Sequence, residues 1–206
     1  MEPVLSAEPS DAPPPIPDRR RTEVVRKALH FLIGLAPVLA GLNRTFTLAL
    51  LAGGTLAYAV MEALRRRGLA VPLISTLTVF ASRRRDRGRF VLGPVTLGAG
   101  AFLSLLIFPP DVAAVAVYAL AFGDGTASLA GKFIGRIRPP CLWGKSLEGS
   151  LACFLGALLS ARLASGSWRT ALIAAIAAAV TELLPVRDWD NIIIPLTVGA
   201  AVFFSR

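Results

Sequence analysis

The chain is poor in charge and in the side chains that form disulfide or metal frameworks. Only 17% of its 206 residues are charged, whereas about a quarter are charged in a typical soluble domain. Its two cysteines provide neither a disulfide framework nor a metal-binding spacing. We therefore expect neither a soluble globular domain nor a cysteine-stabilised module.

Apolar residues dominate instead, because 54% of the chain is hydrophobic. Apolar runs near the length of about 20 residues that crosses a bilayer recur along the sequence. The runs lie at 45–64, 90–108, 112–131, 147–164 and 169–186, with shorter ones at 28–42 and 190–204. They predict an all-α, polytopic integral membrane protein with about seven transmembrane helices.

The basic residues indicate orientation in the membrane rather than a nucleic-acid partner. The net charge is +9, but arginine and lysine occur in short clusters between apolar runs, without interleaved aromatic residues. Clusters at Arg65–Arg67 and Arg83–Arg85 flank the apolar segment Leu69–Ala81, which at roughly 13 residues is short for a span. We expect an interfacial or re-entrant segment there, which keeps both clusters cytoplasmic. A short eighth span is the alternative.

Residues 1–18 differ in composition from the rest of the chain. They are rich in proline and small polar residues, including Pro13, Pro14 and Pro15. Such a segment cannot bury a core, so a disordered tail is predicted. Its acidic and proline residues precede the arginine cluster at Arg19–Arg21, which does not match a cleavable signal peptide. Residues 19–206 are predicted to form one membrane-embedded domain.

The predicted topology brings several ionisable residues to one side of the membrane. Charge that faces lipid is costly, so ionisable residues in apolar runs are functional candidates. Those at the cytoplasmic ends of the predicted spans are His30, Glu62, Arg65, Asp124, Lys145, Glu148 and Asp190. We therefore expect one site at the cytoplasmic face.

The segment GDGTASLAG, from Gly123 to Gly131, places Asp124 in an apolar helix between two glycines. An aspartate in such a helix is expected to be paired, metal-bound or protonated. Metal ligation is one interpretation, and a pair with a lysine or arginine that locks two helices together is the other. Asp190 and Asn191, at the start of the last run, offer further oxygen ligands of the kind that Mg²⁺ accepts.

The segment GKSLEGS, from Gly144 to Ser150, opens the next apolar run. Its backbone amides then face the cytoplasm at a helix start, where anions bind, and Lys145 adds a point charge, although the P-loop spacing is absent. Glu148 is predicted to hold a metal-bound water or to orient Lys145, or else to form a capping box with Ser146. Lys132 and Arg136 either clamp a polyphosphate from one helical face or anchor the helix as positive-inside residues.

These segments together resemble the polyprenol kinase family, which includes dolichol kinase, phytol kinase and the CTP-dependent diacylglycerol kinase. The similar segments are RKALHFLIG at Arg26–Gly34, MEALR at Met61–Arg65, GDGTASLAGKFIGR at Gly123–Arg136, KSLEGS at Lys145–Ser150 and DWDNIIIPL at Asp188–Leu196. The resemblance covers nearly the whole chain after residue 18 and is specific only when these segments are taken together.

The resemblance implies an integral membrane enzyme that uses CTP and Mg²⁺, or another divalent cation, to phosphorylate a membrane lipid alcohol. The catalytic residues would be Asp124, His30 and Asp190. The nucleotide would bind Lys132, Arg136, Lys145, Ser146, Glu148 and Gly149, and the acceptor would lie beside Arg26, Lys27, Glu62 and Arg65. The metal ligands would be Asp124, Asp190, Glu148 and Asn191. Either His30 or a metal-bound carboxylate would remove the hydroxyl proton.

Two other functions remain open. The central block is distantly similar to phosphatidate cytidylyltransferases, which make CDP-diacylglycerol, but their C-terminal signature K-R-x(4)-K-D, followed by G-H-G-G and D-R-x-D, is absent. A small-solute transporter would place Asp124 and Glu148 along a pathway near mid-membrane, whereas the predicted charges gather at one face. The acceptor stays open among a polyprenol or dolichol, phytol and diacylglycerol, because each presents a hydroxyl at the interface.

Overall fold

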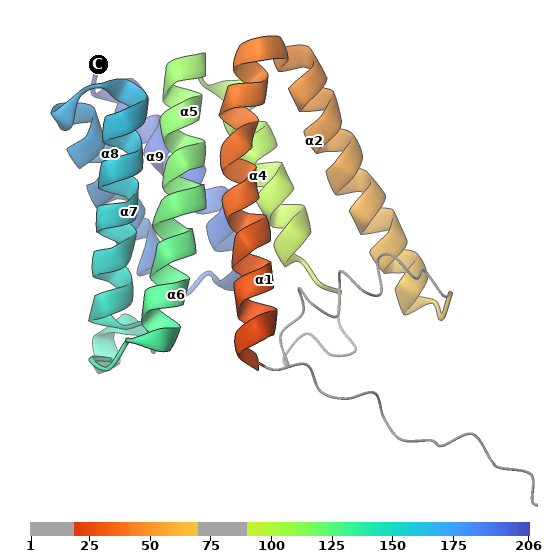
Figure 1. The fold of residues 1–206 in the computed structure, drawn as a ribbon, viewed down its shortest axis with the longest axis horizontal. Helices are drawn as coiled ribbons and strands as arrows, with labels where there is room; N and C mark the ends of the chain where they lie inside the picture. The colour runs from red at the N-terminus through yellow and green to blue at the C-terminus, as the bar shows by residue number, and fades with distance from the viewer. Residues whose placement is uncertain (1–18, 70–89) are drawn as a thin grey trace, which may run out of the picture.

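The computed structural model describes residues 19–69 and 90–206, and in these residues every regular element is helical (Figure 1). The all-α prediction is therefore confirmed for the described part of the chain. The predicted tail at 1–18, nearly all of the segment 69–81 and the arginine cluster at 83–85 lie outside the described residues.

Most of the helices lie within the apolar runs of the sequence, whereas the first helix begins in a polar segment before the first run. They are α1 (Arg19–Leu32), α2 (Ala36–Arg66), α4 (Gly93–Ile107), α5 (Pro110–Tyr118), α6 (Gly125–Phe133), α7 (Leu147–Ser165), α8 (Trp168–Glu182) and α9 (Asp190–Phe204). A 3₁₀ turn, Ile33–Leu35, joins α1 to α2, and a π-helical turn, Ala119–Asp124, joins α5 to α6.

Three helical stretches of the described residues are long and apolar enough to cross a membrane. They are Arg26–Arg66, Pro110–Phe133 and Leu147–Ser165, and Gly93–Ile107 is a shorter apolar helix. Apolar helices of this length indicate a membrane protein. The count of seven spans stays a prediction.

The first of these stretches contains a sharp kink, at which the chain reverses direction (Figure 1). Asn43 has extended backbone angles, φ −154° and ψ 100°, inside α2. Its side-chain oxygen accepts a hydrogen bond of 2.9 Å from the backbone N–H of Phe46, as an N-cap does. Arg44 donates to the carbonyl oxygen of Leu105 at the end of α4. The kink therefore falls where the sequence predicted the first span to end.

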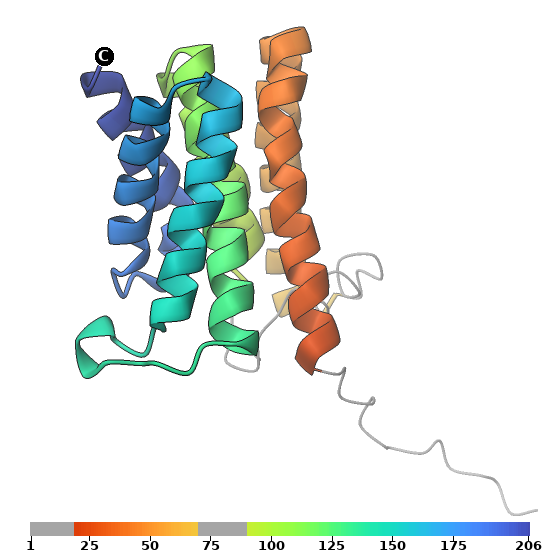
Figure 2. The same ribbon diagram turned by 60° about the vertical axis from the view of Figure 1, so that its left-hand side comes forward.

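The continuous rod of α5, the π-helical turn and α6 lies at the centre of the bundle (Figures 1 and 2). Of its most apolar window 67% is buried, against 11% for Arg26–Arg66 and 22% for α7. Small residues of α7 and α8, such as Ala157, Ala161, Ala174 and Ala178, are fully buried in the core.

Large apolar side chains, in contrast, point outwards. Leu42 is 82% exposed and Leu163 is 87% exposed. A soluble protein would bury such leucines, whereas membrane helices pack through small residues and turn large ones to lipid. The alanines of α7 and α8 therefore serve close helix packing, and the leucine shell supports a bundle that lies in a bilayer.

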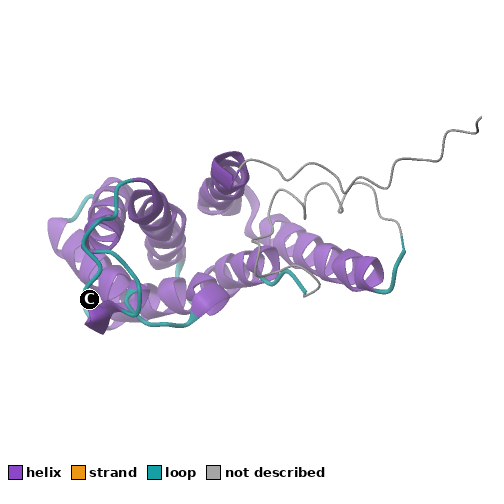
Figure 3. Cartoon of the chain, turned by 90° about the horizontal axis from the view of Figure 1, so that it is seen from below, coloured by secondary structure: helices purple, strands orange, loops and turns teal. Residues whose placement is uncertain are grey.

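The connections between the helices lie at two opposite ends of the bundle. At the lower end in Figure 1 lie the start of α1, the end of α2, the start of α4 and the α6–α7 connection, and at the upper end lie the α4–α5 and α7–α8 connections. Figure 3 views the lower end along the helices. The elements that carry the predicted site residues all reach this lower end, but the end of α2 stands apart from α1 (Figures 1 and 3).

We expect the two ends to face opposite sides of the membrane. In a background with Cys141 and Cys153 replaced, single cysteines at Arg138 and Arg187 should react with a membrane-impermeant maleimide from one side of sealed vesicles. Cysteines at Asp111 and Ser167 should react only from the other side, because these positions begin α5 and cap α8 at the upper end. Labelling of all four from one side would contradict the spanning bundle.

Candidate active site

Three buried polar side chains meet between α1 and the central rod. The Lys27 ammonium lies 3.0 Å from Asp124 Oδ2, and His30 Nε2 lies 3.2 Å from the same oxygen. Lys27, His30 and Asp124 are 3%, 5% and 7% exposed. The RKALH and GDG segments, about a hundred residues apart in sequence, thus form one buried ionic cluster.

The π-helical turn supplies a backbone carbonyl oxygen as a second partner for His30. His30 Nε2 lies 3.0 Å from the carbonyl oxygen of Leu120, within the turn. Because a carbonyl oxygen only accepts, Nε2 must carry the proton in this hydrogen bond. Turns of this kind are frequent at functional sites. With Nε2 engaged, Nδ1 is the ring nitrogen through which His30 could act as a base.

Helix α1 contacts the central rod along one face. Arg26 donates a long hydrogen bond of 3.4 Å to Ser128 Oγ, and the rings of Phe31 and Phe122 stack with centroids 5.8 Å apart. A side chain at Gly125 would collide with the ring of Phe31. The second glycine of GDG therefore allows α1 to approach the helix that carries Asp124.

A second ionic cluster joins the start of α7 to the end of α8. The Lys145 ammonium lies 2.9 Å from Glu182 Oε1 and also donates to the carbonyl oxygen of Glu182. Glu182 Oε2 accepts a hydrogen bond of 3.2 Å from Ser150. Our sequence analysis missed Glu182, although a lone carboxylate at the end of an apolar run is the same signal that identified Asp124.

Ser146 and Glu148 hold the start of α7 and the loop before it. Ser146 is the N-cap residue, and its hydroxyl accepts a hydrogen bond of 3.1 Å from the N–H of Gly149. Glu148 Oε1 accepts from the backbone N–H groups of Arg136 at 2.9 Å and Ile137 at 3.1 Å. Ser146 thus caps the helix, as one alternative predicted, while Glu148 binds the α6–α7 loop instead of completing a capping box.

The basic residues of this loop differ in their surroundings. Arg138 donates to the carbonyl oxygens of Gly131 and Gly144, so it stabilises the loop. The side chains of Lys132 and Arg136 are exposed at the lower end of the bundle. Their predicted contact with a polyphosphate stays a prediction.

Glu62 is the most deeply buried carboxylate among these candidates. Its side chain is fully buried and accepts two hydrogen bonds of 2.7 Å from Arg65. Glu62 Oε1 also accepts a hydrogen bond of 3.2 Å from the N–H of Val91, just before α4. Glu62, held by its bidentate pair with Arg65, therefore connects α2 to the residues just before α4. The place of Glu62 on the acceptor side stays a prediction.

Asp190 and Asn191 begin α9 beside α4. The amide of Asn191 donates to Thr96 Oγ1 at 2.9 Å and to the Gly93 carbonyl oxygen at 3.4 Å. Asp190 Oδ1 accepts a hydrogen bond of 2.9 Å from the N–H of Asn191. Asp190 is partly buried in the first turn of α9.

The fit of these residues to a magnesium ion is partial. Within residues 19–69 and 90–206, no group of three or more His, Cys, Asp and Glu side chains is placed to hold a metal ion. Mg²⁺ does not require such a cage, since it is usually held by one or two carboxylates together with substrate phosphates. Asp124 is the carboxylate that fits this role best, because the closest contacts of Lys27 and His30 are both to Oδ2.

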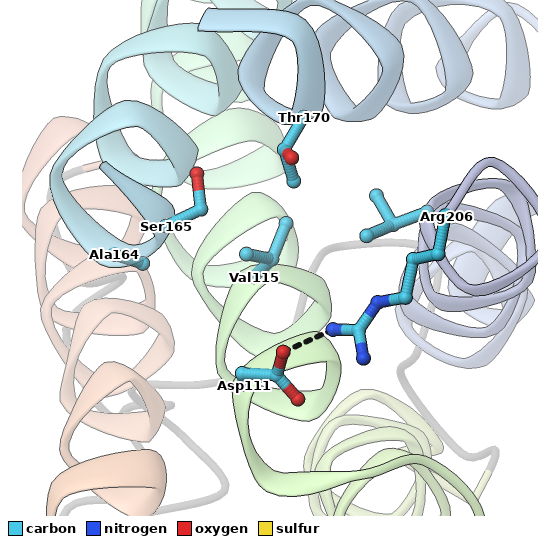
Figure 4. Close-up of a pocket in the computed structure, with 7 residues that line it drawn as sticks. Asp111, Val115, Ala164, Ser165, Thr170 and Arg206 are labelled. Atoms are coloured by element: carbon cyan, nitrogen blue, oxygen red, sulfur yellow. Dashed lines mark hydrogen bonds and ion pairs between the residues drawn. The ribbon is translucent and has the colours of Figure 1, made fainter. Parts of the chain in front are cut away.

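A pocket of about 320 Å³ lies at the opposite end of the bundle (Figure 4). Asp111 and Arg206 form an ion pair across it, and Ser165 and Thr170 line another side. None of the residues that line it belongs to the predicted site, so the pocket does not bear on the chemistry at the lower end.

Comparison with known proteins supports the resemblance drawn from the motifs. The chain is 31% identical over 154 residues to a probable chloroplastic phytol kinase of Triticum aestivum, a match that covers 66% of this chain and 51% of the wheat protein. It is 25% identical over 154 residues to the CTP-dependent diacylglycerol kinase 1 of Schizosaccharomyces pombe, covering 73% of this chain and 71% of the yeast protein. No family model matches the chain, and no solved structure matches it significantly.

The chain thus spans about half the length of the wheat relative. Both relatives are lipid kinases by name, so the predicted resemblance to the polyprenol kinase family is confirmed.

The Lys27–Asp124 pair predicts how substitutions at these two positions change the free energy of unfolding. Lys27→Met leaves the Asp124 carboxylate buried without its ammonium partner, which should lower the free energy of unfolding by about 3–5 kcal/mol. Adding Asp124→Asn removes the stranded charge and should recover part of that loss. Unfolding in detergent measures both effects, with the exposed Lys132→Met as the matched control. A double variant less stable than Lys27→Met would contradict the pairing.

Proposed function

We propose that this chain is a CTP-dependent lipid alcohol kinase that transfers the γ-phosphoryl group to a membrane lipid hydroxyl at the cytoplasmic face. The contact of Lys27 and His30 with Asp124 carries the proposal, because it joins two motifs of lipid kinases into one buried site. The cluster at Arg65–Arg67, at the end of α2, supports a cytoplasmic orientation of this end of the bundle.

In this proposal the nucleotide binds at the α6–α7 connection. Lys145 and the positive end of the α7 dipole, around Ser146 and Gly149, would hold the triphosphate, since a helix N-terminus favours anions. Lys132 and Arg136 would add positive charge from the exposed end of α6 and the loop. Mg²⁺, when bound, would neutralise phosphate charge beside Asp124, with Asp190, Glu148 and Asn191 as further proposed ligands.

The acceptor lies on the α1 and α2 side of the same end. Arg26, Lys27 and His30 would flank the hydroxyl, and Glu62 and Arg65 are proposed to border the acceptor from α2. The hydroxyl oxygen attacks the γ-phosphorus, the bond from that phosphorus to the β–γ bridging oxygen breaks, and CDP leaves. The hydroxyl proton passes to His30 Nδ1 or to a carboxylate. Positioning and charge neutralisation supply most of the catalysis in phosphoryl transfer.

The acceptor is a lipid alcohol of the polyprenol, phytol or diacylglycerol kind. One relative is named for phytol and the other for diacylglycerol, and both alcohols place a hydroxyl at the membrane surface beside an apolar tail. The exposed leucines of α1 beside His30, Leu29 and Leu32, suit a site that such a lipid reaches from within the bilayer.

Labelled CTP tests the reaction. The purified chain is incubated with membrane lipids, Mg²⁺ and CTP labelled at either the α or the γ phosphorus, and the lipid is then extracted. We expect label in the lipid from γ-labelled CTP alone. Label from α-labelled CTP would show transfer of CMP and favour a cytidylyltransferase, and label from neither would remove the kinase proposal.

Asp190→Asn tests whether Asp190 is a metal ligand, and it leaves the buried Lys27–Asp124 pair in place. Asparagine can keep the hydrogen bond from the N–H of Asn191, but it loses the negative charge that Mg²⁺ requires. We expect turnover to be abolished while the midpoint of thermal unfolding is unchanged. Asp188→Asn, two residues earlier, is the matched control. Near-normal turnover of Asp190→Asn would remove Asp190 from the metal site.

A further inference from the structure

Glu182 is a buried acid that none of the kinase-like segments contains. It is the last residue of α8 and is 8% exposed. Its carboxylate contacts two residues of KSLEGS, Lys145 through Oε1 and Ser150 through Oε2. An acid from outside the motifs is thus bonded to the lysine that the proposed function assigns to phosphate.

The contact with Glu182 also fixes where the Lys145 ammonium lies. A lysine ammonium has three hydrogen-bond donors, and Glu182 accepts from Lys145 with both Oε1 and its carbonyl oxygen. That carbonyl is at the C-terminus of α8, where a cation is favoured. The lysine stem is flexible in isolation, so these contacts hold the charge beside the start of α7.

Packing between α7 and α8 does not require this ion pair. Ala157 and Ala161 of α7 and Ala174 and Ala178 of α8 are fully buried in the same core and already bring the two helices together. Burying a charge pair is expensive, and an apolar pair of similar size is often as stable or more stable. The placement of a carboxylate here is therefore better explained by its effect on Lys145.

We propose that Glu182 is a positioning residue for nucleotide binding. Resting on the proposed function, this inference assigns Glu182 to hold Lys145 so that its remaining donor points to a phosphate of CTP. Glu182 itself does not touch the nucleotide. Its effect therefore passes entirely through Lys145, and it should vanish when Lys145 is absent.

Glu182→Asp separates position from charge, because it keeps the carboxylate and withdraws it by one methylene group. The measurement is the equilibrium dissociation constant for CTP with Mg²⁺ in detergent, for the single variant, for Lys145→Met and for the double variant. We expect Glu182→Asp to weaken CTP binding about tenfold, the scale of one misplaced charge-assisted hydrogen bond. In the Lys145→Met background, Glu182→Asp should change nothing further.

Thr181→Val is the matched control. Thr181 is buried beside Glu182 and bonds only within its own helix, to the carbonyl oxygen of Ala177. This variant should lower stability without changing the dissociation constant for CTP. Unchanged CTP binding by folded Glu182→Asp, or an equal loss with and without Lys145, would overturn the inference and leave Glu182 a purely structural residue.

Two further outcomes keep the inference separate from the proposed function. If Glu182→Asp does not fold, Glu182→Gln replaces it, and an equal change in both Lys145 backgrounds again contradicts the inference. A wild-type chain that binds CTP but transfers no phosphate overturns the kinase proposal, while the CTP affinities still test Glu182. A wild-type chain that does not bind CTP overturns both.

Discussion

The architecture depends on the cost of placing the Asp124 carboxylate inside an apolar bundle. A buried carboxylate is tolerated only when partners compensate its charge. Lys27 and His30 supply these partners, both from α1 and both to Oδ2. The docking of α1 on the central rod, the π-helical turn that presents the Leu120 carbonyl and the absence of a side chain at Gly125 all serve that contact.

Apolar packing places the rest of the bundle around this charge. Small residues let α7 and α8 approach the central rod closely, as the buried alanines of both helices show. A side chain at Gly156 of α7 would collide with the Phe122 carbonyl of the central rod. In a bilayer the lipid is as apolar as leucine, so close van der Waals packing of small residues stabilises helix contacts. Close packing therefore fixes the positions of the helices that carry the ionic clusters.

Hydropathy and charge spacing predicted much of this arrangement. The apolar runs predicted where most of the helices lie. The structure pairs Asp124 with a lysine, because a charge in such a helix needs a partner, while metal ligation by Asp124 stays a prediction. The sequence could not identify the π-helical turn, since its residues fit an ordinary helix equally well. It also missed Glu182, whose partner Lys145 lies 37 residues away, and the binding of Glu148 to loop amides, which depends on tertiary folding.

Helix α7 connects the two ionic clusters. Its first turns carry Ser146 and Ser150, and one turn further Cys153 is fully buried. A side chain at Gly123 would touch Cys153, so this face of α7 lies against the residue that precedes Asp124. A small apolar thiol suits that position, because a larger side chain would push α7 away from the central rod and a charged one would add a further buried charge. In the proposed reaction, the phosphate-binding start of α7 and the carboxylate beside the acceptor are therefore parts of one packed unit, and a shift of either would move both.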